Sequence, residues 1–167
     1  GPALAEFVIA NIESAIEGNA HTIILEIDTL GGRLDYTYKI KDAVNKAINK
    51  GINIISFVND EAQSAGVMIA MLGQKVAMAP GSSMGSAEVR PFDEKFNSAW
   101  AGELKAVAEA RGRDGEIVAA MADKDIYIEG VTEKGKLLNV TTNRAKELGL
   151  CDIIVNNRQE LLEAYGL

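Results

Sequence analysis

The sequence predicts an α/β fold in which a mostly parallel sheet is built from right-handed β-α-β units and flanked by helices. Short, apolar, β-branched runs alternate along the chain with segments whose apolar residues recur at helical spacing. The runs are almost continuously apolar, which is typical of parallel strands buried on both faces. Small-residue turns follow these strands, and in such sheets binding sites form beyond the carboxyl ends of the strands.

The amino-terminal part of the chain predicts two strands, each preceded by a helix. Apolar residues at helical spacing predict the first helix over residues 3–17, namely Leu4, Phe7, Val8, Ile12 and Ile16. The second helix, residues 33–50, is amphipathic and ends before Gly51, as helices commonly do. The strands are expected at residues 22–28 and 52–58, followed by turns at residues 29–32 and 59–63.

Shorter elements are expected in the rest of the chain. They are a helix at 64–72, a strand at 75–79, a small-residue segment at 82–87, an irregular loop at 88–93, helices at 94–111 and 116–123, short strands at 126–128 and Val131, a hairpin turn at 132–136, a helix at 142–148, a strand at 151–155 and a helix at 159–165. Strands and helices continue to alternate, so the same sheet is expected to extend through this part.

Composition limits the class of protein. A chain of 167 residues is long enough for one domain with a sizeable core, so residues 1–167 are expected to form a single domain. The net charge of −7 argues against a nucleic-acid partner. Cys151 is the only cysteine, which excludes an internal disulfide and a cysteine metal cluster, and neither a metal nor a cofactor is expected. No apolar run reaches the length of a membrane span.

Ser64 stands at the expected junction between the second strand and the next helix. Its neighbours Ala65 and Gly66 are small, which suits a tight strand-to-helix turn. A serine here is a candidate nucleophile, because free backbone N–H groups and the positive end of the helix favour an oxyanion beside it. The alternative is a helix N-cap, since serine is a preferred capping residue.

Gly31-Gly32 follows the first strand and opens the second helix. The spacing matches neither the P-loop nor the dinucleotide-binding pattern. One interpretation is a tight turn. The other is one wall of an oxyanion hole, in which the N–H groups of Gly32 and Ala65 point at the same oxygen.

A serine nucleophile needs a base. His21, the one histidine in the sequence, precedes the first strand and is expected at the opposite edge of the sheet, which argues against a Ser-His-Asp triad. Lys105 shares a helix face with Ala101 and Ala108. Such a lysine either reaches out to water or is desolvated, in which case a lowered pKa makes the neutral amine available as a general base.

Four motifs together carry a family resemblance. They are Leu30-Gly31-Gly32, Ser64-Ala65-Gly66, the segment Ala79-Pro80-Gly81-Ser82-Ser83-Met84-Gly85-Ser86-Ala87, and Glu103-Leu104-Lys105 on the long helix. In order and spacing the chain resembles the NfeD membrane serine proteases, of the Clp-protease-like group that includes signal peptide peptidase A. The resemblance implies a Clp-protease/crotonase-like fold and a Ser-Lys dyad. It makes Ser64 the nucleophile, Lys105 the base, and Gly32 and Ala65 the oxyanion-hole donors.

The resemblance also has implications beyond the site. Leu30 replaces the proline that usually precedes the glycine pair, and the family's first strand, which precedes the first helix, is absent from this sequence. The family implies a signal peptide and a membrane-spanning region outside this chain, and an extracytoplasmic, membrane-tethered location. It further implies stomatin-like membrane partners with apolar target segments, and a homodimer or larger assembly.

The expected substrate is an extended, apolar peptide that binds as an added strand. Gly31, Gly85 and Ser86 offer backbone without bulky side chains, and Met68 and Met84 are candidate contacts for apolar side chains, with core packing as the alternative for both methionines. Residues 88–97 carry Pro91 and many charges, and are expected to form a mobile flap over the site.

Two other functions stay open from the sequence. A crotonase-type acyl-CoA enzyme shares the oxyanion architecture and would use a carboxylate, for which Glu61 and Glu88 are available. A catalytically weak docking domain that gathers stomatin-like partners would bind without turnover.

Overall fold

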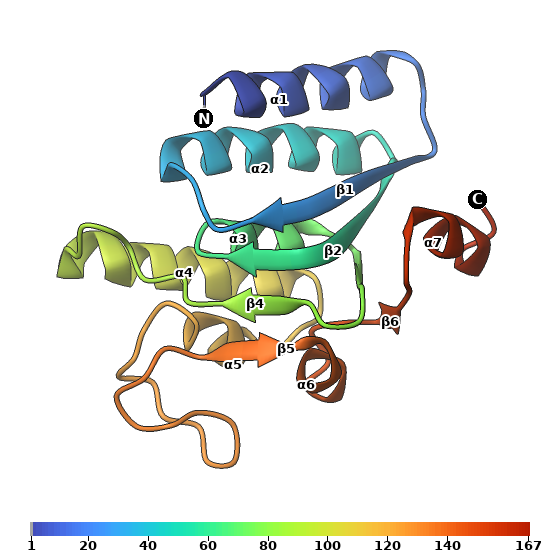
Figure 1. Ribbon diagram of the computed structural model, residues 1–167. Coiled ribbons are helices and arrows are strands. Elements are labelled where there is room, and N and C mark those ends of the chain that lie inside the picture. Colours follow the sequence, from blue (N-terminus) through green and yellow to red (C-terminus); the bar gives the residue numbers. More distant parts are fainter. Residues whose placement is uncertain (1) are drawn as a thin grey trace.

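A mostly parallel β-sheet lies at the centre of the molecule, with helices on both of its faces (Figure 1). The computed structural model describes residues 2–167, apart from the side chains of residues 2–5 and 7. The helices are α1 (Pro2–Glu17), α2 (Leu34–Asn49), α3 (Gly66–Leu72), α4 (Glu94–Ala110), α5 (Gly115–Ala119), α6 (Thr142–Glu147) and α7 (Arg158–Ala164). The strands are β1 (Thr22–Thr29), β2 (Asn53–Gln63), β3 (Lys75–Met78), β4 (Ser83–Gly85), β5 (Asn139–Thr141) and β6 (Ile153–Ile154).

Strand β2 is the centre of this sheet. The order is β5-β4-β2-β3-β6, β1 also pairs with β2, and every pairing is parallel except that of β4 with β5. Along β2 the neighbour changes: residues 55–58 pair with β3, whereas residues 61–63 pair with β4. The carboxyl ends of β1, β2 and β4 therefore lie together at one edge (Figure 1).

Burial on both faces explains why the strands are continuously apolar. In β2, Ile54 and Val58 belong to the main core, which the sheet shares with α2, α3 and α4. Ile55 and Phe57 point to the other face and pack with Leu161 of α7 in a second core. The expected parallel α/β architecture is thereby confirmed.

The expected turn at residues 59–63 is wrong, because β2 continues to Gln63. Its polar residues find partners in the region of β4: the N–H of Asp60 donates to Ser82 Oγ at 2.9 Å, and Gln63 Nε2 donates to Ser83 Oγ at 3.0 Å. Local sequence could not supply these partners, because they come from about 20 residues further along the chain.

The strands expected at 126–128 and at Val131 are also wrong, since this stretch is irregular. Thr132 organises it instead, and its Oγ1 accepts from the N–H of Ile128 at 2.8 Å. A turn is present near 134–135, but it joins no hairpin, whereas β5 was not expected at all. In α1, the expected apolar positions Leu4 and Phe7 lie outside the described side chains.

None of the described helices combines the length and apolarity needed to cross a membrane.

Candidate active site

Ser64 follows directly on the last residue of β2, at the edge where the parallel strands end. Its φ angle of 55° lies in the left-handed region, which costs a residue with a side chain on the order of 1 kcal/mol or more. The N–H of Ser64 donates to the carbonyl of Gly85 at 3.0 Å, and its own carbonyl accepts from the N–H of Val67 at 3.1 Å. These two hydrogen bonds, to Gly85 and from Val67, hold Ser64 in the strained conformation.

The N-cap interpretation of Ser64 is not supported. Helix α3 begins at Gly66, so Ala65 occupies the cap position, and no side chain caps the helix. Within the described part of the chain, no hydrogen bond engages the Ser64 hydroxyl. The Oγ is therefore left for an external partner.

Gly31 lies against Ser64. A β-carbon built on Gly31 would stand 2.9 Å from Ser64 Cβ and 3.2 Å from its Oγ. Gly31 also has a φ angle of 137°, and its N–H donates to Thr29 Oγ1 at 3.1 Å. Glycine is required here for both reasons: the backbone conformation disfavours a side chain, and any side chain would meet the serine.

The two expected oxyanion donors have free N–H groups. Among the described residues, neither the N–H of Gly32 nor that of Ala65 donates a backbone or side-chain hydrogen bond. Both residues line the same groove. This arrangement is compatible with an acceptor oxygen supplied by a ligand.

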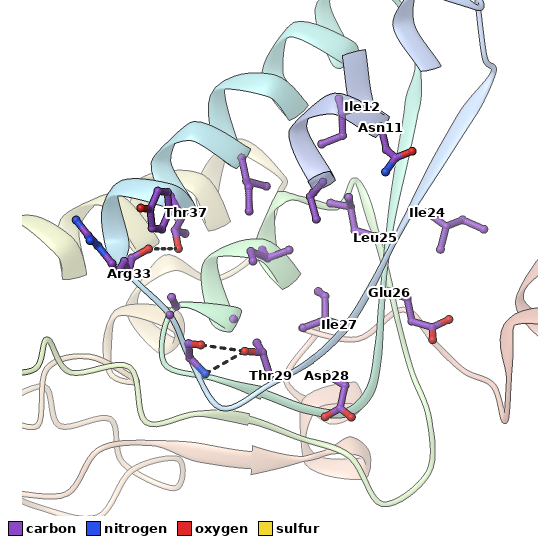
Figure 2. Close-up of a pocket in the computed structure, with 18 of the residues that line it drawn as sticks. Asn11, Ile12, Ile24, Leu25, Glu26, Ile27, Asp28, Thr29, Arg33 and Thr37 are labelled. Carbon is purple, nitrogen blue, oxygen red and sulfur yellow. Dashed lines mark hydrogen bonds between the residues drawn. The ribbon is translucent and has the colours of Figure 1, made fainter. Parts of the chain in front are cut away.

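The groove runs from the Gly31-Gly32 turn along β1 and under α1 and α2, with a volume of about 400 Å³ (Figure 2). Leu25 and Ile27 point from β1 toward the helices, and Glu26 and Asp28 lie on the other side of the strand (Figure 2). Within the described sheet, β1 pairs with β2 alone, so its outer backbone edge is open. The candidate site thus continues into a groove lined mainly by apolar side chains.

Of the two alternatives for Lys105, the structure supports the one in which the side chain reaches out to water. Its side chain is 42% exposed, and its Nζ lies 2.9 Å from Glu116 Oε1 in α5. The hydrogen bond and charge of Glu116 raise the pKa of Lys105 above its ordinary value, so the alternative of a lowered pKa is wrong. Spacing alone missed this because the partner belongs to another helix.

Lys95 was not singled out from the sequence, and it is exposed near the start of the same helix. Near the start of α4, Phe92 and Phe96 share a surface groove with Leu34 at the start of α2. Lys95 is in the first turn of α4, and Lys105 is roughly 15 Å further along the helix. Asp93 is the N-cap of this helix, because its side chain accepts a hydrogen bond from the N–H of Phe96.

Other expected site residues fall into two groups. Met68 and Met84 are fully buried in the main core, so the expectation that they contact substrate is wrong and core packing explains them. Gly85 and Ser86 do lie beside Ser64: Gly85 accepts its N–H, and the exposed Ser86 has a φ angle of 49°. His21 directly precedes β1 and so lies at the end of that strand opposite to Ser64, as expected.

Two curated membrane proteins are similar to this chain. Membrane protein NfeD1b of Bacillus subtilis strain 168 is 32% identical over 169 residues, which cover 98% of this chain and 38% of that protein. Membrane-bound protease PH1510 of Pyrococcus horikoshii is 27% identical over 164 residues, covering 91% of this chain and 34% of that protein. The chain thus spans little more than a third of these relatives.

Solved structures agree on the fold. The 1510-N membrane-bound stomatin-specific protease, as a lysine-to-alanine mutant in complex with a substrate peptide, superposes with a TM-score of 0.77 at 26% identity, covering 98% of this chain and 74% of that one. ClpP1 from Listeria monocytogenes has a TM-score of 0.73 at 18% identity, covering 96% and 89%, which shows the fold alone. The expected Clp-protease-like fold is therefore confirmed.

The sequence also matches the NfeD1b N-terminal domain over its whole length, residues 1–167. The order of the Gly31-Gly32 turn, Ser64 and the segment at Gly85, now seen to meet at one edge of the sheet, fits the resemblance noted from the motifs. This chain belongs to the family of NfeD1b N-terminal domains.

Proposed function

We propose that this domain is a serine endopeptidase in which Ser64 is the nucleophile. The observation that carries the proposal is the geometry of Ser64 itself: a left-handed serine at the carboxyl edge of the sheet, in contact with Gly31 and with its hydroxyl unengaged. Strained residues of this kind concentrate at functional sites. The relatives named as proteases add support from homology.

The reaction follows from the groups at this edge. Ser64 Oγ attacks the scissile carbonyl carbon while its proton passes to an amine base. The negative charge that develops on the carbonyl oxygen is accepted by the N–H groups of Gly32 and Ala65. The carbon–nitrogen bond then breaks, the base returns the proton to the leaving nitrogen, and water hydrolyses the acyl-serine ester.

A lysine of α4 is the proposed base, and two are candidates. Lys105 would have to leave Glu116, because its Nζ is held in that ion pair and remains protonated at neutral pH. Lys95 has no ion pair within the described residues, but it lies in the first turn of the helix, roughly 15 Å along the axis from Lys105. We place the base at Lys105, the position that the motif resemblance implies, with closure of residues 88–97 over substrate releasing its amine from Glu116 toward Ser64 Oγ.

The proposed substrate is an extended, apolar segment of a stomatin-like membrane protein. A relative in the solved structures is named as stomatin-specific, and the groove beside Ser64 is lined mainly by apolar side chains. The relatives are named as membrane proteins, so we propose an extracytoplasmic domain that is tethered through regions outside this chain. A homodimer or larger assembly is part of the proposal, and light scattering of the purified domain tests it.

The central test uses two readouts on the purified domain. A fluorophosphonate probe reports an activated serine without any peptide, and a panel of apolar peptides reports cleavage by mass spectrometry. Ser64→Ala should abolish both signals, since loss of an activated nucleophile costs many orders of magnitude in rate. Ser98→Ala is the matched control, because Ser98 is exposed on α4.

The outcomes separate the competing functions. Cleavage that persists in Ser64→Ala would remove Ser64 as the nucleophile. Modification of an acyl-CoA without peptide cleavage would favour the crotonase-type reaction. Binding of a stomatin-like segment by both parent and Ser64→Ala, with no turnover in either, would make the domain a docking module.

A further inference from the structure

The segment after β4 is held in place by α4. Gly85 accepts the N–H of Ser64 at 3.0 Å, and the chain then continues through Ser86 to Val89. Trp100 Nε1 donates to the carbonyl of Ala87 at 2.9 Å, and the N–H of Val89 donates to Asn97 Oδ1 at 2.9 Å. The backbone that holds the proposed nucleophile is therefore connected to the helix that carries the proposed base.

The side chains of Asn97 and Trp100 are both buried and hydrogen-bonded. Asn97 is 6% exposed, and its Nδ2 donates to the carbonyl of Ala122 at 3.0 Å, so one amide joins two separate loops. Trp100 is 1% exposed and meets Tyr38 of α2 edge-on, with ring centroids 5.9 Å apart. Neither side chain lies free to contact a substrate.

The spacing of Asn97 and Trp100 along α4 matches the spacing of the two backbone groups that they bind. Asn97 and Trp100 are one helical turn apart and thus lie on one face, separated by roughly 4.5 Å along the axis. Their targets, Ala87 and Val89, are two residues apart on an irregular stretch that lacks its own ladder. Helix α4 supplies the hydrogen bonds that a neighbouring strand would otherwise give.

We propose that Asn97 and Trp100 are positioning residues for the peptidase reaction, which fix the segment 85–89, and through Gly85 the Ser64 backbone, relative to helix α4. The proposal rests on the function proposed above, with Ser64 as nucleophile. We call this pair and its two bonds the α4 clamp. Loosening it should misplace the nucleophile by a fraction of an ångström while leaving the substrate groove along β1 intact.

The first test is kinetic. Trp100→Phe keeps an aromatic ring in the core and removes only the N–H donor, and Asn97→Ala removes both amide contacts. Each should lower kcat by about tenfold with KM changed less than about twofold, because small misalignments of reacting groups are costly. Asn97→Asp retains an acceptor for the Val89 N–H and should recover part of the loss.

The matched control is Glu103→Gln, which weakens a different polar contact of the same helix. Glu103 Oε2 pairs with Lys41 Nζ at 2.8 Å in α2, away from the clamped segment. It should leave kcat and KM unchanged. A kcat loss as large as that of Trp100→Phe would show that any loosening of α4 suffices, and would overturn the clamp.

A second test does not depend on activity. Amide hydrogen exchange at residues 86–89 is measured in the Ser64→Ala background, with and without Trp100→Phe. Exchange there should rise at least about fivefold while the core strand β2 stays protected. Unchanged exchange overturns the clamp, and faster exchange with unchanged kcat overturns its positioning role. If the parent protein neither labels nor cleaves, the proposed function fails, whereas the exchange result still decides whether the clamp exists.

Discussion

The backbone of Gly31 lies in contact with the side chain of Ser64, so that a β-carbon at Gly31 would come within 2.9 Å of Ser64 Cβ. These residues are separated by all of α2 and all of β2, and the parallel pairing of Thr29 with Ala62 brings them together. The glycine turn thus shapes the space in which the serine hydroxyl can move. A substrate carbonyl can approach because no side chain occupies that space.

Gly31→Ala should abolish serine labelling and peptide cleavage. Its added methyl group would collide with Ser64, and its φ of 137° would be strained with any side chain. Gly51→Ala is the matched control, since Gly51 has a φ of 84° and open space around it. The control should lose about 1 kcal/mol of stability and keep its activity. Equal labelling rates in both variants would contradict a role for the Gly31 contact.

Ser64→Gly should make the protein more stable but inactive. Glycine adopts a φ of 55° without strain, whereas serine and alanine do not. Compared with Ser64→Ala, which retains the strain, Ser64→Gly should gain about 0.5–1 kcal/mol in the free energy of unfolding by urea titration. A glycine variant less stable than the alanine variant would show that the serine conformation is not strained.

The fold could be predicted well because both faces of the sheet are covered. Largely apolar runs such as residues 54–58 are typical of strands buried on both faces, and the glycine after α2 marked the end of that helix. The errors arose where hydrogen bonds come from distant segments. The polar end of β2 is paired by β4, and the apolar residues 126–128 are held by Thr132 without forming a strand.

The position of the serine and of the glycine turn could be predicted from the sequence, whereas the surroundings of the lysine could not. The serine and the glycine turn follow strands, and parallel pairing alone brings such turns together. The surroundings of a lysine depend on which helix packs beside it, which spacing along α4 cannot reveal. Glu116 lies in α5, and its ion pair with Lys105 could not be inferred from the alanines on the Lys105 face.

Lys105→Ala should abolish peptide cleavage, and Lys95→Ala should retain it within about threefold. The reason is the proposed chemistry: Lys105 accepts the serine proton once its Nζ has left Glu116, whereas Lys95 is exposed in the first turn of α4. The measurement is kcat/KM across pH 6–9 for both variants and for Lys105→Arg, which stays protonated and should be inactive. An inactive Lys95→Ala beside an active Lys105→Ala would assign the base to Lys95.

The ion pair of Lys105 should affect stability in a defined pH range. The hydrogen bond and charge of Glu116 raise the pKa of Lys105 above 10.5, so the contribution of the pair is complete below that pH. It is lost as pH rises through the higher pKa of the folded state. Glu116→Gln should therefore lower the unfolding temperature slightly at pH 8 and have no effect well above pH 10.5.

Glu133→Gln serves as the control for this effect, because the Lys136–Glu133 pair is exposed by 73% and 76% and should contribute less. A difference between Glu116→Gln and the parent protein that grows with rising pH would contradict the assigned direction.

Phe96→Ser should weaken the binding of apolar peptides. Large apolar side chains gather on the surface where α2 and α4 begin, with Leu30 exposed by 79%, Phe92 by 53% and Phe96 by 65%. A second groove, lined in part by Leu34, Phe92 and Phe96, opens there. Such exposed clusters mark interaction sites, and covering one phenylalanine ring is worth roughly 1.5–3 kcal/mol.

We expect KM for an apolar peptide to rise about tenfold in Phe96→Ser with kcat preserved, because the side chain contacts substrate and not the reacting atoms. Tyr127→Ser is the control, since Tyr127 is 52% exposed and lines neither groove. The measurement is a peptide panel of fixed length in which apolar residues are replaced stepwise by charged ones. Preference of the parent protein for the charged peptides, or an equal rise of KM in both variants, would show that this surface does not select apolar substrates.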